Sequence, residues 1–166
     1  MDGFTCSRCG EFHGEFPMCF GAEFPDFYFS VPPEERNARI ELTESLCVVD
    51  EAHFFIRGRI EIPVTGSNEL FCWNVWTSLS EENFIRVNER WNDERRTEEP
   101  AYFGWLQTQL PGYADTLNLK TMVHTQAVGI IPRIELIEKG HALTQEQQAG
   151  IAWQRVTELV EIAMHG

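Results

Sequence analysis

The chain has 166 residues, of which 43% are hydrophobic and 12% aromatic, a composition typical of globular rather than disordered proteins. Its formal net charge of -13, from 26 acidic and 13 basic side chains, opposes nucleic-acid binding, because affinity for phosphate backbones depends on cationic side chains. No apolar run approaches the roughly 20 residues of a membrane-spanning helix, and a signal-peptide pattern is absent. We therefore expect one soluble, cytoplasmic domain over residues 1–166, with no membrane association.

The first predicted feature is a turn-rich segment over residues 1–20 that contains potential metal ligands. Cys6 and Cys9 are separated by two residues and followed by Gly10, a spacing in which a tight turn directs two thiolates at one ion. His13 is near enough in sequence to be a third ligand. Five cysteines are an odd number, and in a reducing compartment they are expected to be thiols or metal ligands. The pattern predicts a zinc knuckle that holds a structural Zn2+.

Two cysteines are candidates for the fourth ligand. Cys19 would give a local Cys-x2-Cys-x3-His-x5-Cys arrangement, similar to the nucleic-acid-binding zinc knuckle with its histidine one place early. Cys47 would instead tie the N-terminal segment to the first strand of the sheet. We favour Cys47, because a long-range ligand contributes tertiary organisation and because the basic residues that surround a retroviral-type knuckle are scarce here.

Residues 21–45 are acidic and rich in proline. Pro33 followed by two glutamates predicts a short helix, because proline and acidic side chains are favourable in the first turn. Glu35 and Arg39 have the spacing of a helical ion pair. The aromatic run Phe27 to Phe29 is interpreted as covering one edge of the core, and a binding platform is the alternative.

A three-stranded β-meander over residues 46–79 is the predicted centre of the fold. Its second strand alternates between an apolar face and a polar face that carries Arg57, Arg59 and Glu61, which predicts one buried and one solvated side. The third strand is apolar on both faces. That strand is therefore expected to be central in the sheet.

A helix is predicted over residues 80–91. Ser80 is a favourable N-cap, two glutamates follow it, and Phe84, Val87 and Trp91 recur on one helical face. The polar run from Asn92 to Pro100 is expected to be a flexible loop.

Residues 101–137 form the second predicted strand group, in which Pro132 indicates an edge strand or a bulge. A C-terminal helical region over residues 144–165 is expected to begin with a Thr144–Gln147 capping box and to be interrupted at Gly150. The sequence thus predicts an α+β fold: a mostly antiparallel sheet with two main helices and an N-terminal zinc-knuckle segment.

Four strings in the sequence resemble the uncharacterised bacterial family called domain of unknown function 2199: FTCSRCGEFH, LCVVDEAHFFIRGRIEIPV, SLSEENF and GWLQTQLPGYADTLNLKTMVHT. The resemblance extends over nearly the whole chain. It implies a bacterial, soluble, single-domain protein in which the metal-ligand pattern of the family corresponds to Cys6, Cys9, His13 and Cys47. Cys19 and Cys72 are not part of that pattern. The family name implies no biochemical activity.

The favoured functional hypothesis is a non-catalytic binding or interaction module with a structural zinc site, since four protein ligands leave no coordination position for substrate. The first alternative is a zinc-dependent hydrolase with an open metal position, in which Glu11, Glu51 or His53 acts as general base. The sequence contains no helical His-Glu-x-x-His and no nucleophile elbow, which counts against catalysis.

A second alternative is an acidic immunity-type protein that binds a basic protein partner, as the negative charge permits. His124 and the Arg57/Arg59 pair are candidate contacts, although a solvated surface explains each of them as well. A redox role for Cys6 and Cys9 is disfavoured, because a thioredoxin-like motif precedes a helix and here the motif is followed by a glycine.

Overall fold

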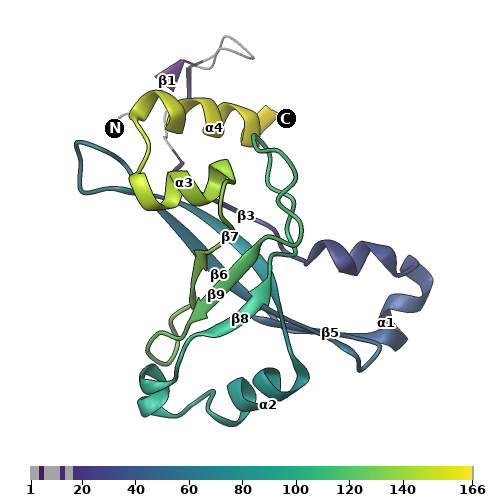
Figure 1. Cartoon of the computed structure of the whole chain (residues 1–166). Helices are drawn as coiled ribbons and strands as arrows, with labels where there is room; N and C mark the ends of the chain where they lie inside the picture. Colours follow the sequence, from purple (N-terminus) through teal and green to yellow (C-terminus); the bar gives the residue numbers. More distant parts are fainter. Residues whose placement is uncertain (1–3, 6–11, 14–16, 166) are drawn as a thin grey trace.

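A computed structural model of the chain describes residues 4–5, 12–13 and 17–165, and their arrangement is shown in Figure 1. The described part contains a short two-stranded sheet, an eight-stranded sheet, four α-helices and three 3-10 segments. The strands are β1 (Phe4–Thr5), β2 (Phe12–His13), β3 (Cys19–Gly21), β4 (Ile40–Leu42), β5 (Leu46–Val49), β6 (His53–Pro63), β7 (Leu70–Leu79), β8 (Tyr102–Trp105), β9 (Lys120–His124) and β10 (Arg133–Leu136). The helices are η1 (Asp26–Ser30), η2 (Pro33–Glu35), α1 (Arg36–Arg39), α2 (Glu81–Glu89), η3 (Glu94–Glu98), α3 (Ala142–Ala149) and α4 (Trp153–His165).

The predicted β-meander is confirmed by β5, β6 and β7, which pair in sequence order and antiparallel. Asp50 and Glu51 connect β5 to β6 with φ angles of 54° and 56°, the left-handed conformation that a tight hairpin of this hand requires. The expected solvated face of β6 is covered at its start, because Phe55 is buried there. The alternation holds farther along, where Arg57, Arg59 and Glu61 share one half-buried face.

The large sheet follows the order β3-β7-β6-β10-β9-β8 and is mostly antiparallel, with parallel pairs β3–β7 and β6–β10. Beyond β8 the chain returns to β7: Leu106 forms a bridge with Thr77, and the Gln107 N–H donates to the Trp76 carbonyl at 2.7 Å. The sheet therefore curls until its last strand meets β7 again. The prediction of an edge strand at Pro132 is wrong, because this residue precedes β10, which lies between β6 and β9.

Gly104 allows this closure. A Cβ atom at this position would lie 2.1 Å from the Ser78 carbonyl oxygen and 2.7 Å from Thr77 Oγ1, so β8 crosses β7 at a distance that excludes any side chain. Thr77 and Thr121 are fully buried at the crossing, and their hydroxyls are 2.8 Å apart. The Thr121 hydroxyl also donates to the Gly104 carbonyl, which satisfies these polar groups inside the sheet.

The buried side chains form a main core and a smaller satellite cluster. The main core lies inside the curled sheet and includes side chains from α2, α3 and α4. The satellite cluster lies on the opposite face of β6 and β7, where β5 contributes Cys47 and Val49, and Phe27 of η1 packs against it. Its fully or nearly fully buried members are Val31, Cys47, Val49, Phe55 and Trp76.

Helix α2 begins as predicted, because the Ser80 hydroxyl accepts a hydrogen bond from the Asn83 N–H and Phe84 is buried. The predicted loop after it contains η3, in which Arg96 is buried. The C-terminal region also differs from the prediction. His141 rather than Thr144 caps α3, since its side chain accepts from the Leu143 N–H.

Gly150, with a φ of 85°, separates α3 from α4 at the interruption that the sequence predicts. Figure 1 shows α3 and α4 at one end of the sheet and α2 at the other. The α+β class and the mostly antiparallel sheet are thus confirmed, whereas the described part has four α-helices rather than two main ones.

Candidate functional site

The predicted zinc knuckle falls largely on residues that the structure does not describe. Cys6 and Cys9 lie outside the described residues, and of His13 only the backbone is described, within β2. Strands β1 and β2 pair antiparallel, with Phe4 opposite His13 and Thr5 opposite Phe12. The six-residue segment that contains both cysteines is therefore connected to two strands that lie side by side.

Cys47 lies in the satellite cluster and is 0% exposed. It is paired with Phe55 of β6, which is in turn opposite Ser78 near the end of β7. Burial raises the pKa of the Cys47 thiol to about 11, which disfavours the thiolate in the absence of a metal. Figure 1 places β1 at the end of the molecule that carries α4, and β5 towards the end that carries α2.

Cys19 is exposed on β3 and lies opposite Cys72 of β7 in the parallel register. Neighbouring residues of paired strands place their side chains on the same face, so the two thiols are neighbours. Burial, with a smaller contribution from Cys19, raises the pKa of the Cys72 thiol to about 11. The alternative fourth ligand of the zinc hypothesis is thus accessible and has a second thiol beside it.

Of the candidate bases of the hydrolase alternative, Glu11 lies outside the described residues. Glu51 belongs to the turn between β5 and β6, and His53 follows it at the start of β6, where its ring packs on Phe27 with centroids 4.4 Å apart. Within the described residues, no three His, Cys, Asp or Glu side chains are close enough together to hold a metal ion.

The aromatic residues after Pro25 do not all pack against the core. Phe27 packs on Phe55 and the satellite cluster, which confirms that part of the run covers the core edge. Tyr28 stacks on Phe24 with ring centroids 4.2 Å apart, and Phe29 is 60% exposed. The Arg36 guanidinium lies 4.6 Å from the Tyr28 ring centre.

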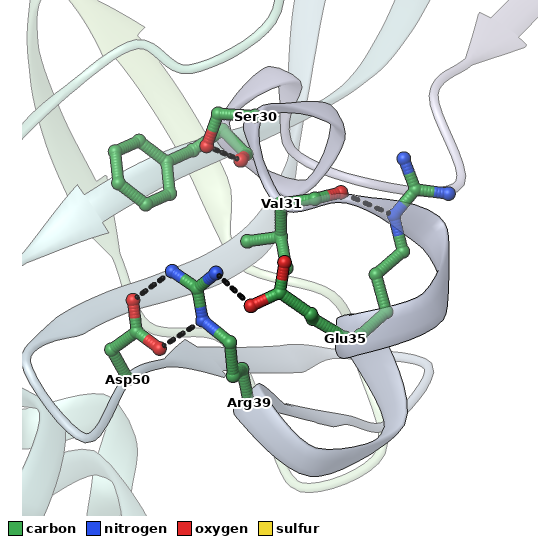
Figure 2. Close-up of polar contacts among 7 residues, drawn as sticks. Ser30, Val31, Glu35, Arg39 and Asp50 are labelled. Carbon is green, nitrogen blue, oxygen red and sulfur yellow. Dashed lines mark hydrogen bonds and ion pairs between the residues drawn. The ribbon is translucent and has the colours of Figure 1, made fainter.

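Figure 2 shows how α1 is held next to the β5–β6 turn. Arg39 donates to both carboxylate oxygens of Asp50 at 2.7 Å and to Glu35 at 3.3 Å, the helical pair expected from the sequence. The hydrogen bonds from Arg39 hold the pKa of the Asp50 carboxyl below its usual range. Nearby, Arg36 Nε donates to the Val31 carbonyl and Ser30 Oγ donates to the Phe27 carbonyl.

A pocket opens where two strands share one edge of β6. The first part of β6, up to Ile56, pairs with β5, and β10 takes over the same edge at Arg59. Arg57 lies between the two, with its N–H bonded to the Ser45 carbonyl, while the Arg59 N–H donates to the Pro132 carbonyl. We call this opening the fork pocket. It has a volume of about 220 Å³ and is lined by Glu44, Ser45, Arg57, Trp91, Arg96 and residues 129–132.

Arg96 forms one wall of the fork pocket and is only 7% exposed. Its guanidinium donates to four backbone carbonyls, at distances from 2.7 to 3.1 Å, and lies 5.4 Å from the centre of the Trp91 ring. No carboxylate is paired with it in the described part of the chain, and burial lowers its pKa. The carbonyls belong to Trp91, Gln126, Ala127 and Ile130.

Arg57 lines the same pocket, and one of its side-chain nitrogens is unsatisfied. Its Nε atom is buried and has no hydrogen-bond partner among the described residues. Glu44 also lines the pocket, yet the two side chains form no ion pair with each other. The fork pocket thus contains one arginine with four hydrogen bonds to backbone carbonyls and one arginine with no described side-chain hydrogen bond.

The sequence identified Arg57 and Arg59 as candidate contacts and His124 as a third, and the structure separates them. Arg59 Nε donates to Asn74 Oδ1 at 3.2 Å, and His124 Nε2 is 2.8 Å from Glu135 Oε1 on the neighbouring strand. Only Arg57 of the three lines the fork pocket. Arg96 was missed, because it lies in a polar run without periodicity.

The comparison with known families gives one match. The family model of domain of unknown function 2199 (DUF2199), described as an uncharacterized protein conserved in bacteria, matches residues 5–151. The chain belongs to this family. No curated protein and no solved structure matches this DUF2199 protein. Among its described helices, none has the length and apolar character needed to cross a membrane.

Proposed function

We propose that this DUF2199 protein is a non-catalytic binding module whose N-terminal segment is stabilised by Zn2+. The observation that carries the proposal is the pairing of β1 with β2, which joins the two ends of the segment containing Cys6 and Cys9 and includes His13 in the second strand. Two thiolates and an imidazole suit Zn2+, and a fourth protein ligand would close the site to substrate.

The two candidates for the fourth ligand, Cys47 and Cys19, both lie among the described residues. Cys47 is the ligand predicted from the sequence, but its thiol is enclosed by apolar side chains of the satellite cluster. Cys19 is exposed and only six residues after His13. These positions support Cys19 over Cys47.

Metal analysis of the purified protein tests the proposal. We expect one zinc per chain in the wild type and its loss in Cys6→Ser and Cys9→Ser. Cys19→Ser is expected to lose zinc and Cys47→Ala to keep it, whereas the reverse result would restore Cys47 as the ligand. Equal zinc in the wild type and Cys6→Ser would reject the site.

A second candidate function is the binding of a cationic protein, and exposed carboxylates near the β5–β6 hairpin support it. Residues 34–51 contain two basic side chains, Arg36 and Arg39, and the second already pairs with carboxylates. The exposed acidic residues of this stretch are Glu34, Glu35, Glu41, Glu44, Asp50 and Glu51.

A pull-down from the native bacterium can compare the wild type with a variant in which Glu34, Glu41, Glu44 and Glu51 are glutamine. This candidate expects a basic protein that the wild type captures and the variant does not. Equal capture by both would reject it.

A further inference from the structure

The geometry points to the fork pocket as a binding site for a small organic oxyanion, a carboxylate or phosphate attached to an apolar group, with Arg57 as its anchor. The inference goes beyond the proposed function and does not depend on zinc. It rests on the topology of β6, on the unused donors of Arg57 and on the composition of the pocket wall.

The pocket is a consequence of the sheet topology. Strand β5 runs antiparallel to β6 and β10 runs parallel to it, and both occupy the same edge of β6. No strand covers that edge at Arg57, because β5 has ended and β10 has not begun. Gly58, the next residue, packs on Ile134 and Pro132, so β10 is held close and the opening is confined to the fork.

The donors of Arg57 specify an acceptor. A buried nitrogen without a hydrogen-bond partner is costly, and native structures satisfy nearly all such groups. Carboxylate and phosphate oxygens match the planar fork of a guanidinium and accept two parallel hydrogen bonds from it. An oxyanion in the pocket would accept from the terminal Nη groups of Arg57, for which the described residues provide no hydrogen bond, and would bring negative charge close to the buried Nε.

The rest of the wall explains the two remaining properties of the ligand. Arg96 contributes a positive charge that no described carboxylate neutralises, although its hydrogen bonds to four carbonyls leave it little donor capacity. Trp91, Ile130 and Pro132 supply apolar surface. The ligand is therefore expected to combine one anionic group with a compact apolar part.

Glu44 is expected to weaken anion binding, so substitutions of Glu44 and Arg57 should change the affinity in opposite directions. Its exposed carboxylate also lines an adjoining pocket of about 390 Å³ and would repel a bound anion. Arg57→Met should therefore weaken binding, while Glu44→Gln should strengthen it.

The test is a titration of the full-length protein with benzoate, phenyl phosphate and benzamide, the last being a neutral isostere of benzoate. The arginine Nε–Hε signals in two-dimensional ¹H–¹⁵N spectra report binding at constant ionic strength. We expect the Arg57 signal to shift with saturation for at least one anion and not for benzamide, while the signal of the 80% exposed Arg95 serves as the control. Response to benzoate alone assigns a carboxylate ligand, and response to phenyl phosphate alone assigns a phosphate.

In Arg57→Met, the Kd for the anion that shifts the Arg57 signal is expected to rise by about tenfold or more, because a charged hydrogen bond is lost. Calorimetry gives this Kd, and an unchanged circular dichroism spectrum shows that the variant is folded. Unchanged Kd in Arg57→Met, equal binding of benzamide, or equal shifts at Arg57 and Arg95 would each overturn the assignment. Saturable shifts of the wild-type Arg57 signal support it even if the variant fails to fold.

Discussion

At the end of β5 that leads into β6, Arg39 lies between two carboxylates, whereas at the other end Arg57 and Arg96 line a pocket without a carboxylate partner. The first arrangement is exposed and its charges are already paired, so it holds α1 in place and offers little to a ligand. The second keeps its positive charge inside an acidic protein. Unpaired cations, rather than arginines as such, distinguish a candidate binding site from a structural contact here.

The largest expected effect concerns Arg96. Arg96→Met should lower the free energy of unfolding by about 3 kcal/mol, because four carbonyls each lose a hydrogen bond and the loop from 126 to 130 loses its attachment to η3. Urea denaturation measures it. Arg57→Met is the matched control and should change stability by less than about 1 kcal/mol, since no described hydrogen bond is removed. Equal losses in the two variants would contradict the distinction between Arg96, which donates four hydrogen bonds, and Arg57, whose side chain has none described.

The next effect concerns the fork itself. A Cβ at position 58 would lie 2.4 Å from Ile134 Cδ1 and 3.1 Å from the Pro132 carbonyl, so Gly58→Ala should displace β10 and cost about 2 kcal/mol. Ile134→Val removes the clashing Cδ1 methyl group but keeps a carbon at the Cγ1 position, which lies 2.5 Å from the same Cβ. In a double-mutant cycle by urea denaturation, the valine should recover part of the alanine's cost, and strict additivity of the two changes would argue against the close contact.

The smallest effect concerns Asp50. Its hydrogen bonds from Arg39 lower its folded-state pKa below the ordinary value of 3.8, so the resulting stability is present above that value and is lost as the pH falls through the lowered pKa. Asp50→Asn should remove this acid-dependent contribution. Between about pH 5 and 2 at low salt, the free energy of unfolding should therefore fall less steeply with decreasing pH for the variant than for the wild type. Parallel profiles of the two proteins would contradict the role of the Arg39–Asp50 pair.

The sequence predicted those elements whose signal is local. Strands β5 to β7 follow from short-range alternation and turn residues, and α2 follows from Ser80 and its capping bond. Strands β3 and β4 have only three residues each, too few to show a period. The start of α3 was misplaced because the histidine ring of His141 performs the capping that a threonine usually provides.

The candidate site was less predictable, because it depends on contacts between distant segments. Alternation placed Arg57 on a polar face, but the pocket beside it exists only because β10 meets β6 at Arg59. The acceptors of Arg96 include carbonyls about thirty residues later in the chain. The metal prediction rests on the spacing of Cys6, Cys9 and His13, and it stays a prediction for the residues outside the described part.

The parallel pairing of β6 with β10 has a consequence for biosynthesis. The meander is complete once Leu79 has left the ribosome, whereas the partner for Arg59 is synthesised much later, at Arg133. Until then one edge of β6 has no paired strand along its second half. Nascent chains with unpaired strand edges are prone to associate with one another. Slow translation or chaperone binding between these two points would therefore affect the yield of this protein more than it affects the finished molecule.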